Sequence, residues 1–298
     1  MNSGDHAVAA ASSAAGAAAT GGRFFSTEPK QLIKIAVYSL LIINFFHYLG
    51  NDINVARHTM HDGWTLKDWT TAFATTFDEL AWFLLLFLLE LETFLLSDAA
   101  FTRRRVLLMH GLRLVCFVAI GHTVFAFGDY LLELDKAIVH TGADLCSFIG
   151  QDVSFAWNLE YSELDTQNCA SLTSADTLYH FAQGQALTDP VGWQIEWELA
   201  WADLVEVVVW LFIIAMIEVM VRLQDKGVTR GPLLKFARLF NACLYGILWI
   251  TAAYWAYRGH WVFAWDETLW ILGFMAIGMN LSDWRKEIEE EEGAVAAS

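Results

Sequence analysis

The chain has 298 residues, a formal net charge of −16 at pH 7, 56% hydrophobic residues and only 17% charged residues. These proportions lie outside the range of water-soluble globular domains and are typical of membrane proteins. The acidic balance, with basic residues gathered at a few segment ends, argues against nucleic acid as a partner.

The chain opens with residues 1–30, which are rich in Ala, Ser and Gly and carry few charges. A segment of this composition buries too little apolar surface to fold, so we expect a disordered cytoplasmic tail. It lacks the basic start and following apolar run of a cleavable signal peptide. At the other end, residues 285–298 contain the acidic run EIEEEE at 287–292 and are expected to form a second, acidic cytoplasmic tail.

Between the tails, residues 31–284 contain six apolar segments that are long enough to cross a bilayer, which takes roughly 20 helical residues. Their approximate bounds are 31–50, 79–97, 106–128, 199–222, 234–257 and 266–283. Continuous apolar runs such as residues 83–89 lack the alternation of membrane strands. We therefore predict an all-α polytopic bundle of six transmembrane helices arranged as three hairpins, with residues 129–197 inserted as a long outer loop and the lipid bilayer as surroundings.

Three apolar segments open with similar combinations of acidic residues and Trp. The sequences are DELAW at 78–82, WELAW at 197–201 and DETLW at 266–270. This similarity suggests a pseudo-repeat of the three hairpins. Repeats in membrane proteins commonly surround a shared site.

Lys and Arg gather near the N-terminus, in the 98–105 and 223–235 connections and near the C-terminus. The positive-inside rule then places both termini in the cytoplasm, with the chain in the inner (plasma) membrane. Cys146 and Cys169 fall together in the outer loop. An oxidising compartment would join them in a disulfide bond.

Before the second span, Thr65 precedes Asp68 by three residues, as in a capping box. Leu66, Trp69 and Phe73 follow at helical spacing, which predicts a short amphipathic helix lying on the outer membrane surface. Several Trp residues near the starts of the fourth and sixth spans favour an interfacial aromatic belt. They are Trp193, Trp197, Trp201, Trp261, Trp265 and Trp270.

Some acidic residues fall inside the predicted spans, where an ionisable group is costly without a partner or water. Helical rise places Glu92 at the depth of Arg113, and Glu218 at the depth of Arg238. We predict two ion pairs, each joining an even helix to the next one. They would either fasten neighbouring helices or line a polar inner vestibule.

Glu90 and Glu206 have no basic residue at matching depth. Asp203 lies on the same helical face as Glu206, and other acidic residues stand at the expected outer mouth. The predicted cation pathway consists of Glu90, Asp203, Glu206, Glu79, Glu198 and Glu267. The alternative is a protonated Glu that forms a hydrogen bond to a neighbouring helix.

Two histidines, His47 and His122, are predicted at similar depth on different helices. Such a pair could be the axial ligands of a b-type haem. Apart from haem as an alternative we predict no cofactor, and metal binding is undetermined. The sequence has no phosphate loop, nucleophile elbow or HExxH helix, so an enzyme is not favoured.

Three functional hypotheses follow. The first is a cation or proton channel or transporter that uses the intramembrane carboxylates. The second is a non-catalytic membrane subunit or assembly protein that binds a partner membrane protein, or a second copy, through the outer loop. The third is a haem- or quinone-linked redox protein. The unpartnered carboxylates favour the first.

Overall fold

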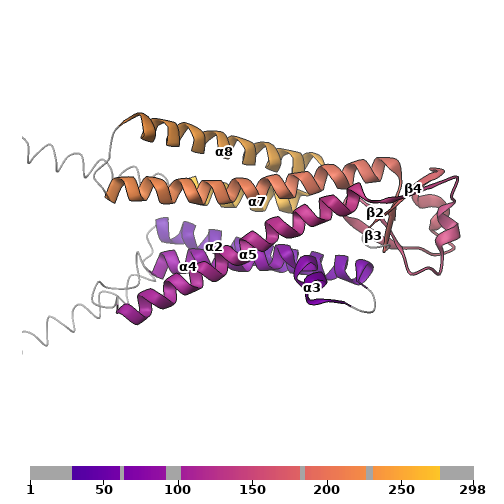
Figure 1. Cartoon of the computed structure of the whole chain (residues 1–298), viewed down its shortest axis with the longest axis horizontal. Helices are drawn as coiled ribbons and strands as arrows, with labels where there is room; N and C mark the ends of the chain where they lie inside the picture. Colours follow the sequence, from indigo (N-terminus) through magenta and orange to yellow (C-terminus); the bar gives the residue numbers. More distant parts are fainter. Residues whose placement is uncertain (1–28, 61–63, 92–101, 182–184, 226–230, 276–298) are drawn as a thin grey trace, which may run out of the picture.

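The computed structural model describes residues 29–60, 64–91, 102–181, 185–225 and 231–275. In these ranges the chain forms an elongated bundle of helices with a small β-sheet beyond one end (Figure 1). We call that end the sheet end of the bundle.

Among the described residues, three helices are long and apolar enough to cross a membrane. They are α5 (Arg103–Asp135), α7 (Pro190–Asp225) over its part to Met220, and α8 (Pro232–Tyr257). The helices α3 (Leu66–Ala72) and α4 (Ala74–Glu90) qualify only when taken together, and they are bent by 68° at their junction. The predicted helical membrane architecture is therefore confirmed in this coarser form.

Six spans and the pseudo-repeat are not established by the described residues. The helix α2 (Pro29–Thr59) contains the first predicted span, but it does not meet the length and hydropathy criteria together. The sixth segment is helical over residues 261–275, and the rest of it lies outside the described residues. The arrangement as three hairpins stays a prediction.

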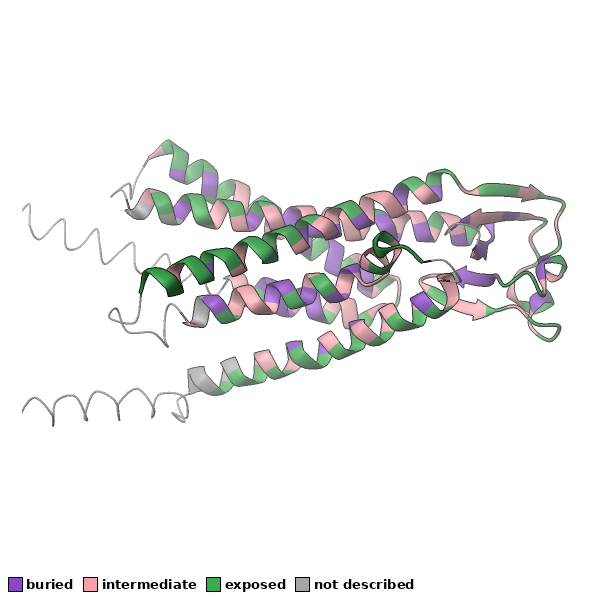
Figure 2. Ribbon diagram, turned by 60° about the horizontal axis from the view of Figure 1, so that its bottom comes forward, coloured by how far each residue is buried: buried purple, intermediate pink, exposed green. Residues whose placement is uncertain are grey.

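Many large apolar residues on the membrane-length helices are exposed, and exposed positions recur along the length of the bundle (Figure 2). Leu107 on α5 is 73% exposed, and Ile250 on α8 is 71% exposed. Water-soluble monomers rarely expose large apolar patches, so these faces fit a hydrocarbon environment.

The core of the bundle is built around aromatic side chains. The ring centroid of Trp82 on α4 lies 5.8 Å from that of Trp210 on α7 and 5.9 Å from that of Trp270. Ile120 on α5 and Leu248 on α8 are fully buried in the same cluster. Aromatic rings at these separations pack edge to face or tilted, which orients each ring relative to the next.

The predicted position in an interfacial aromatic belt is wrong for Trp270. Trp270 is buried in the core, whereas Trp201, Trp261 and Trp265 are exposed. Trp270 follows the acidic doublet 266–267 by one helical turn and faces Trp82 across the bundle.

The capping box that opens α3 is confirmed. The Asp68 backbone N–H donates to Thr65 Oγ1 at 3.3 Å, and the Thr65 N–H donates to Asp68 Oδ2 at 2.8 Å. The Lys67 ammonium lies 2.7 Å from Asp129 on α5, which ties this short helix to the bundle.

The predicted all-α fold is wrong for the loop between α5 and α7. It forms a five-stranded mixed sheet in the order β1-β4-β5-β2-β3, in which β2 and β5 are parallel and the other neighbours antiparallel. The strands are β1 (Ile138–Thr141), β2 (Ser154–Trp157), β3 (Glu160–Glu163), β4 (Thr177–Phe181) and β5 (Ala186–Thr188). Each is short, and a buried cluster that includes Phe155, Leu178 and Leu187 packs beneath them.

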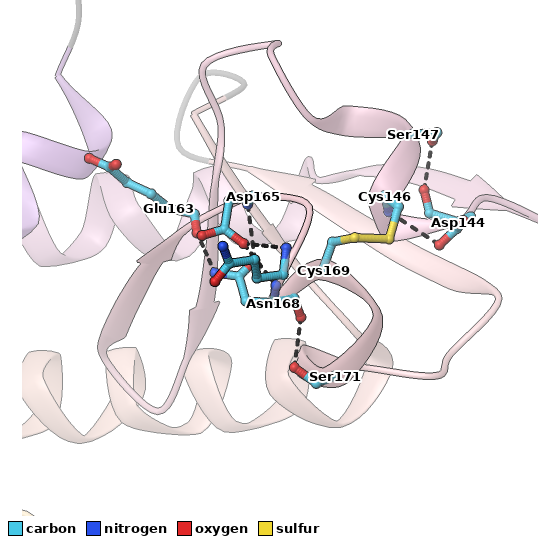
Figure 3. The surroundings of a disulfide bond; sticks show 9 residues. Asp144, Cys146, Ser147, Glu163, Asp165, Asn168, Cys169 and Ser171 are labelled. Atoms are coloured by element: carbon cyan, nitrogen blue, oxygen red, sulfur yellow. Dashed lines mark hydrogen bonds between the residues drawn. A yellow bond between two sulfur atoms is a disulfide. The ribbon is translucent and has the colours of Figure 1, made fainter.

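The predicted disulfide is confirmed. Cys146 in the 3₁₀ helix η4 (Leu145–Phe148) is bonded to Cys169 at the start of α6 (Cys169–Leu172), with Cα atoms 5.1 Å apart (Figure 3). Around it, Asp144 caps η4 through the Cys146 N–H, and Asp165 accepts hydrogen bonds from the two N–H groups that lead into α6. The bond therefore joins two short helices, each preceded by an Asp side chain that accepts hydrogen bonds from backbone N–H groups, at the far tip of the molecule.

Candidate acidic cavity

A cavity of about 540 Å³ lies at the sheet end of the bundle. Its walls come from α2, α4, α7, the end of α8 and the 261–275 helix, and the turn between β2 and β3 reaches it. Seven of its lining residues are acidic: Asp52, Asp78, Glu79, Glu160, Asp203, Glu206 and Asp266. Among the described lining residues there is no Lys or Arg. We call this space the acidic cavity.

Tryptophan indoles hold three of the carboxylates in or beside the acidic cavity. Trp82 Nε1 donates to Asp78 at 3.0 Å, and Trp255 Nε1 donates to Glu206 at 2.9 Å. Beside the cavity, the Trp210 indole donates to Glu267 at 3.1 Å. Trp82, Trp210 and Trp255 are all buried, so these carboxylates are positioned by the aromatic core itself.

Asp266 and Glu79 face each other across the cavity wall. Asp266 accepts hydrogen bonds from two α2 residues, Asn44 Nδ2 at 2.7 Å and the Tyr48 hydroxyl at 3.4 Å. Glu79 is 7% exposed and interacts with the Asp266 carboxyl group both electrostatically and through a side-chain hydrogen bond, and no N–H donor among the described residues reaches its Oε2. Two buried carboxyl groups in contact cannot both be ionised without a large cost in free energy, so this position favours a bound proton or cation.

Two groups at the rim lie outside the predicted spans. Burial raises the pKa of Asp52 to about 6, against two opposing hydrogen bonds from Thr76. Burial also lowers the pKa of His260, and the nearby Glu160 only partly offsets this. His260 is therefore mainly neutral at pH 7 and does little to balance the carboxylates.

A tight turn forms the sheet-end boundary of the cavity. Asn158 and Leu159, between the paired residues Trp157 and Glu160, have φ angles of 54° and 64°. Two consecutive positive φ values match the twist of a hairpin, but Leu rarely adopts them. Contacts from the bundle hold this turn: the Leu159 N–H donates to Glu196 at 2.8 Å, and Asn158 Nδ2 donates to the Arg258 carbonyl at 3.1 Å.

A second cavity of about 320 Å³ adjoins the first, between α3, α5 and the sheet. Asp203 and Leu159 line both cavities. Lys67, Tyr130 and other polar side chains line the second cavity with Asp203. Asp203 therefore lies between two acidic spaces, of which the second also contains Lys67, paired with Asp129.

The predicted cation pathway is only partly gathered here. Glu79, Asp203 and Glu206 line the acidic cavity, and Glu267 lies beside it through Trp210. Glu198 does not line it, because its carboxylate pairs with Arg258 and accepts a 2.8 Å hydrogen bond from the Tyr254 hydroxyl. The Glu90 side chain lies outside the described residues.

The predicted ion pairs have different outcomes. Glu218 pairs with Arg222, one turn along α7, at 2.7 Å and not with Arg238, whose Nε donates to the Leu234 carbonyl at 3.4 Å. An i, i+4 pair on one exposed helix face needs no approach of a second helix. Glu92 lies outside the described residues, so its pair with Arg113 stays a prediction.

The predicted haem ligands are not in contact. His47 borders the acidic cavity and lies near Asn51, whereas the His122 ring stacks on Phe125 of its own helix at 5.9 Å. The structure describes both rings and shows no contact between them. Within the described ranges, no group of three His, Cys, Asp or Glu side chains is arranged to hold a metal ion.

Sequence reasoning missed Asp52, Asp78, Asp266 and the amide of Asn44. The signal for two of them was present in the Asp-Glu doublets at 78–79 and 266–267, which open two segments in the same way. The doublets face each other because α4 and the 261–275 helix pack through Trp82 and Trp270.

Comparisons with protein family models, with curated proteins and with solved structures found no match for this chain.

Proposed function

We propose that this protein is a membrane channel or transporter that binds cations or protons in the acidic cavity. The observation that carries the proposal is the contact of two buried carboxyl groups, Glu79 and Asp266, in a cavity that has seven acidic and no Lys or Arg lining residues among those described. A low-dielectric space of one charge sign concentrates ions of the opposite sign. Intramembrane carboxylates commonly mark ion or proton routes.

The direction of entry follows from the proposed topology. Among the described residues, Arg103, Arg104 and Arg105 at the start of α5 and Lys235 at the start of α8 lie at the opposite end from the sheet, which supports cytoplasmic termini in an inner (plasma) membrane. The Cys146–Cys169 bond in the sheet supports an oxidising exterior on the other side. Cations would then reach the acidic cavity from outside, past the Asn158–Leu159 turn.

The test is flux into proteoliposomes that contain the purified full chain, with Na⁺, K⁺ or a pH gradient as the driving ion. We expect flux above that of empty liposomes, and a large loss of it in Glu79→Gln and in Glu206→Gln. The matched control is Glu218→Gln, which removes an exposed carboxylate paired on its own helix. Flux equal to that of empty liposomes for every ion would refute the proposal.

One observation favours the second candidate, a subunit that binds a partner through its outer sheet. Among the described strands β1 pairs with β4 alone, and its Ile138 and Val139 are 62% and 51% exposed. An exposed apolar edge strand is a ready site for pairing with another chain. A stable complex that is lost in Val139→Lys, together with an absence of flux, would favour this reading.

A further inference from the structure

The size of the acidic cavity sets the first limit on its ligand. At about 540 Å³ it falls within the range of about 300–1,000 Å³ that small organic molecules occupy. One dehydrated inorganic cation would fill a small part of that volume.

The carboxylates are also spread over the cavity wall and do not converge on one point. Asp52 comes from α2, Glu79 from α4, Glu206 from α7 and Asp266 from the 261–275 helix. Within the described ranges no three such side chains are placed around a common metal position. Separate carboxylates suit a ligand that carries several positive groups at a distance from one another.

Aromatic rings stand between these carboxylates. The Phe263 ring centroid lies 5.1 Å from those of both Tyr48 and Trp255, and all three residues line the cavity with Trp210. Aromatic faces bind alkylammonium groups and pack against methylene chains. Because Trp255 and Trp210 donate their indole N–H groups to Glu206 and Glu267, their faces are held in place.

We propose that the acidic cavity binds an organic polycation, namely an aliphatic polyamine. One ammonium group would lie between the Glu79 and Asp266 carboxylates, where Glu79 Oε2 would accept a hydrogen bond from it, and another would lie at Glu206. The methylene chain between them would lie against Tyr48 and Phe263. This inference rests on the proposed function and names the class of its substrate.

The test is calorimetric titration of the detergent-purified full chain with spermidine, with butylamine, Na⁺ and Mg²⁺ as comparison ligands. We expect spermidine to bind with one-to-one stoichiometry and more tightly than any of the others. Glu79→Gln should weaken it about tenfold or more, because a charge-assisted hydrogen bond is lost. Phe263→Leu should weaken spermidine binding and leave Na⁺ binding unchanged.

Glu218→Gln is the control for non-specific attraction to an acidic protein, and its affinity for spermidine should equal that of the parent. Spermidine binding that is the same in the parent and Glu79→Gln would overturn the inference, as would equal affinity for butylamine or Mg²⁺. If spermidine does not bind while inorganic cations or protons still cross proteoliposomes, only the ligand class fails. If neither binding nor flux occurs, the proposed function fails with it.

Discussion

The carboxylate of Asp52 on α2 accepts two hydrogen bonds from Thr76 in the first turn of α4, from the backbone N–H at 3.0 Å and from the hydroxyl at 2.6 Å. The N-cap residue of α4 is Phe73, which provides no side-chain acceptor. The exposed N–H groups of a helix start need such an acceptor, and here it comes from another helix. Because Asp78 and Glu79 follow in the next turn, the same contact fixes one wall of the acidic cavity.

Replacing this cap should destabilise the bundle. At about pH 4, where Asp52 still makes its full contribution, we expect Asp52→Ala to lower the free energy of unfolding by about 1 kcal/mol, the usual cost of a lost helix cap. Asp52→Asn keeps an acceptor oxygen and should lose less. Thermal unfolding of the detergent-purified protein, followed by Trp fluorescence, measures both. Equal stability of Asp52→Ala and the parent would show that the contact does not cap α4 in solution.

The stability contributed by Asp52 should depend on pH. Its pKa rises by burial from an ordinary value of 3.8 to about 6 in the folded protein. The folded state therefore holds the proton more tightly, so this contribution is complete below the unfolded value and is lost as the pH rises through about 6. Relative to Asp52→Asn, the parent should lose on the order of 2–3 kcal/mol between about pH 4 and pH 7.

The difference between the two proteins isolates Asp52 from the other carboxylates of the cavity. The measurement is the unfolding midpoint of each protein in detergent across that pH range. Parallel curves for the parent and Asp52→Asn would contradict the raised pKa.

Local signals in the sequence predicted local features well. The capping box at Thr65 and Asp68 lies within one helical turn, and long apolar runs such as that of α8 need no partner to be recognised as helices. The Cys146–Cys169 bond was predictable because both cysteines fall in one outer loop. In each case the interacting residues lie close in the sequence or, like the two cysteines, share one predicted loop.

The features that sequence reasoning missed depend on pairings between distant segments. The three residues of β5 form a strand only because Ala186 and Leu187 pair with β2, more than 30 residues earlier, and with β4. Glu79 and Asp266 meet because α4 and the 261–275 helix pack together through Trp82 and Trp270. The spacing of apolar residues within one helix does not show which other helix it packs against. The sequence also predicted that Glu218 pairs with Arg238, because helical rise places both at the same depth. In the structure Glu218 pairs with Arg222 on the same helix, a contact that needs no approach of a second helix.

The disulfide should stabilise the sheet region and leave the bundle largely unchanged. Closing the 23-residue separation between Cys146 and Cys169 is worth about 3 kcal/mol in the chain-entropy model. We expect the double variant Cys146→Ser/Cys169→Ser to increase hydrogen exchange across β1 to β5 with little change in α5 and α8. Cys243→Ser, which removes an exposed free thiol, is the matched control. Unchanged exchange in the sheet would show that its buried cluster suffices without the bond.

The turn at Leu159 should control access to the acidic cavity. In Leu159→Gly the new glycine adopts the φ of 64° freely. The folded state is relieved of about 1–2 kcal/mol of left-handed strain. This offsets the cost of about 0.5–1 kcal/mol that comes from the greater conformational entropy of glycine in the unfolded chain. The free energy of unfolding should therefore stay within about 1 kcal/mol of that of the parent.

Leu159→Gly removes the side chain that lines both cavities, so spermidine or cations should enter the acidic cavity faster than in the parent. Stopped-flow Trp fluorescence on mixing with spermidine, or initial flux in proteoliposomes, measures this rate. Leu159→Asn tolerates the same φ and retains a side chain, so its rate should lie nearer the parent's. If the Gly and Asn variants both match the parent, the turn does not limit entry, and cations reach Glu79 by another route.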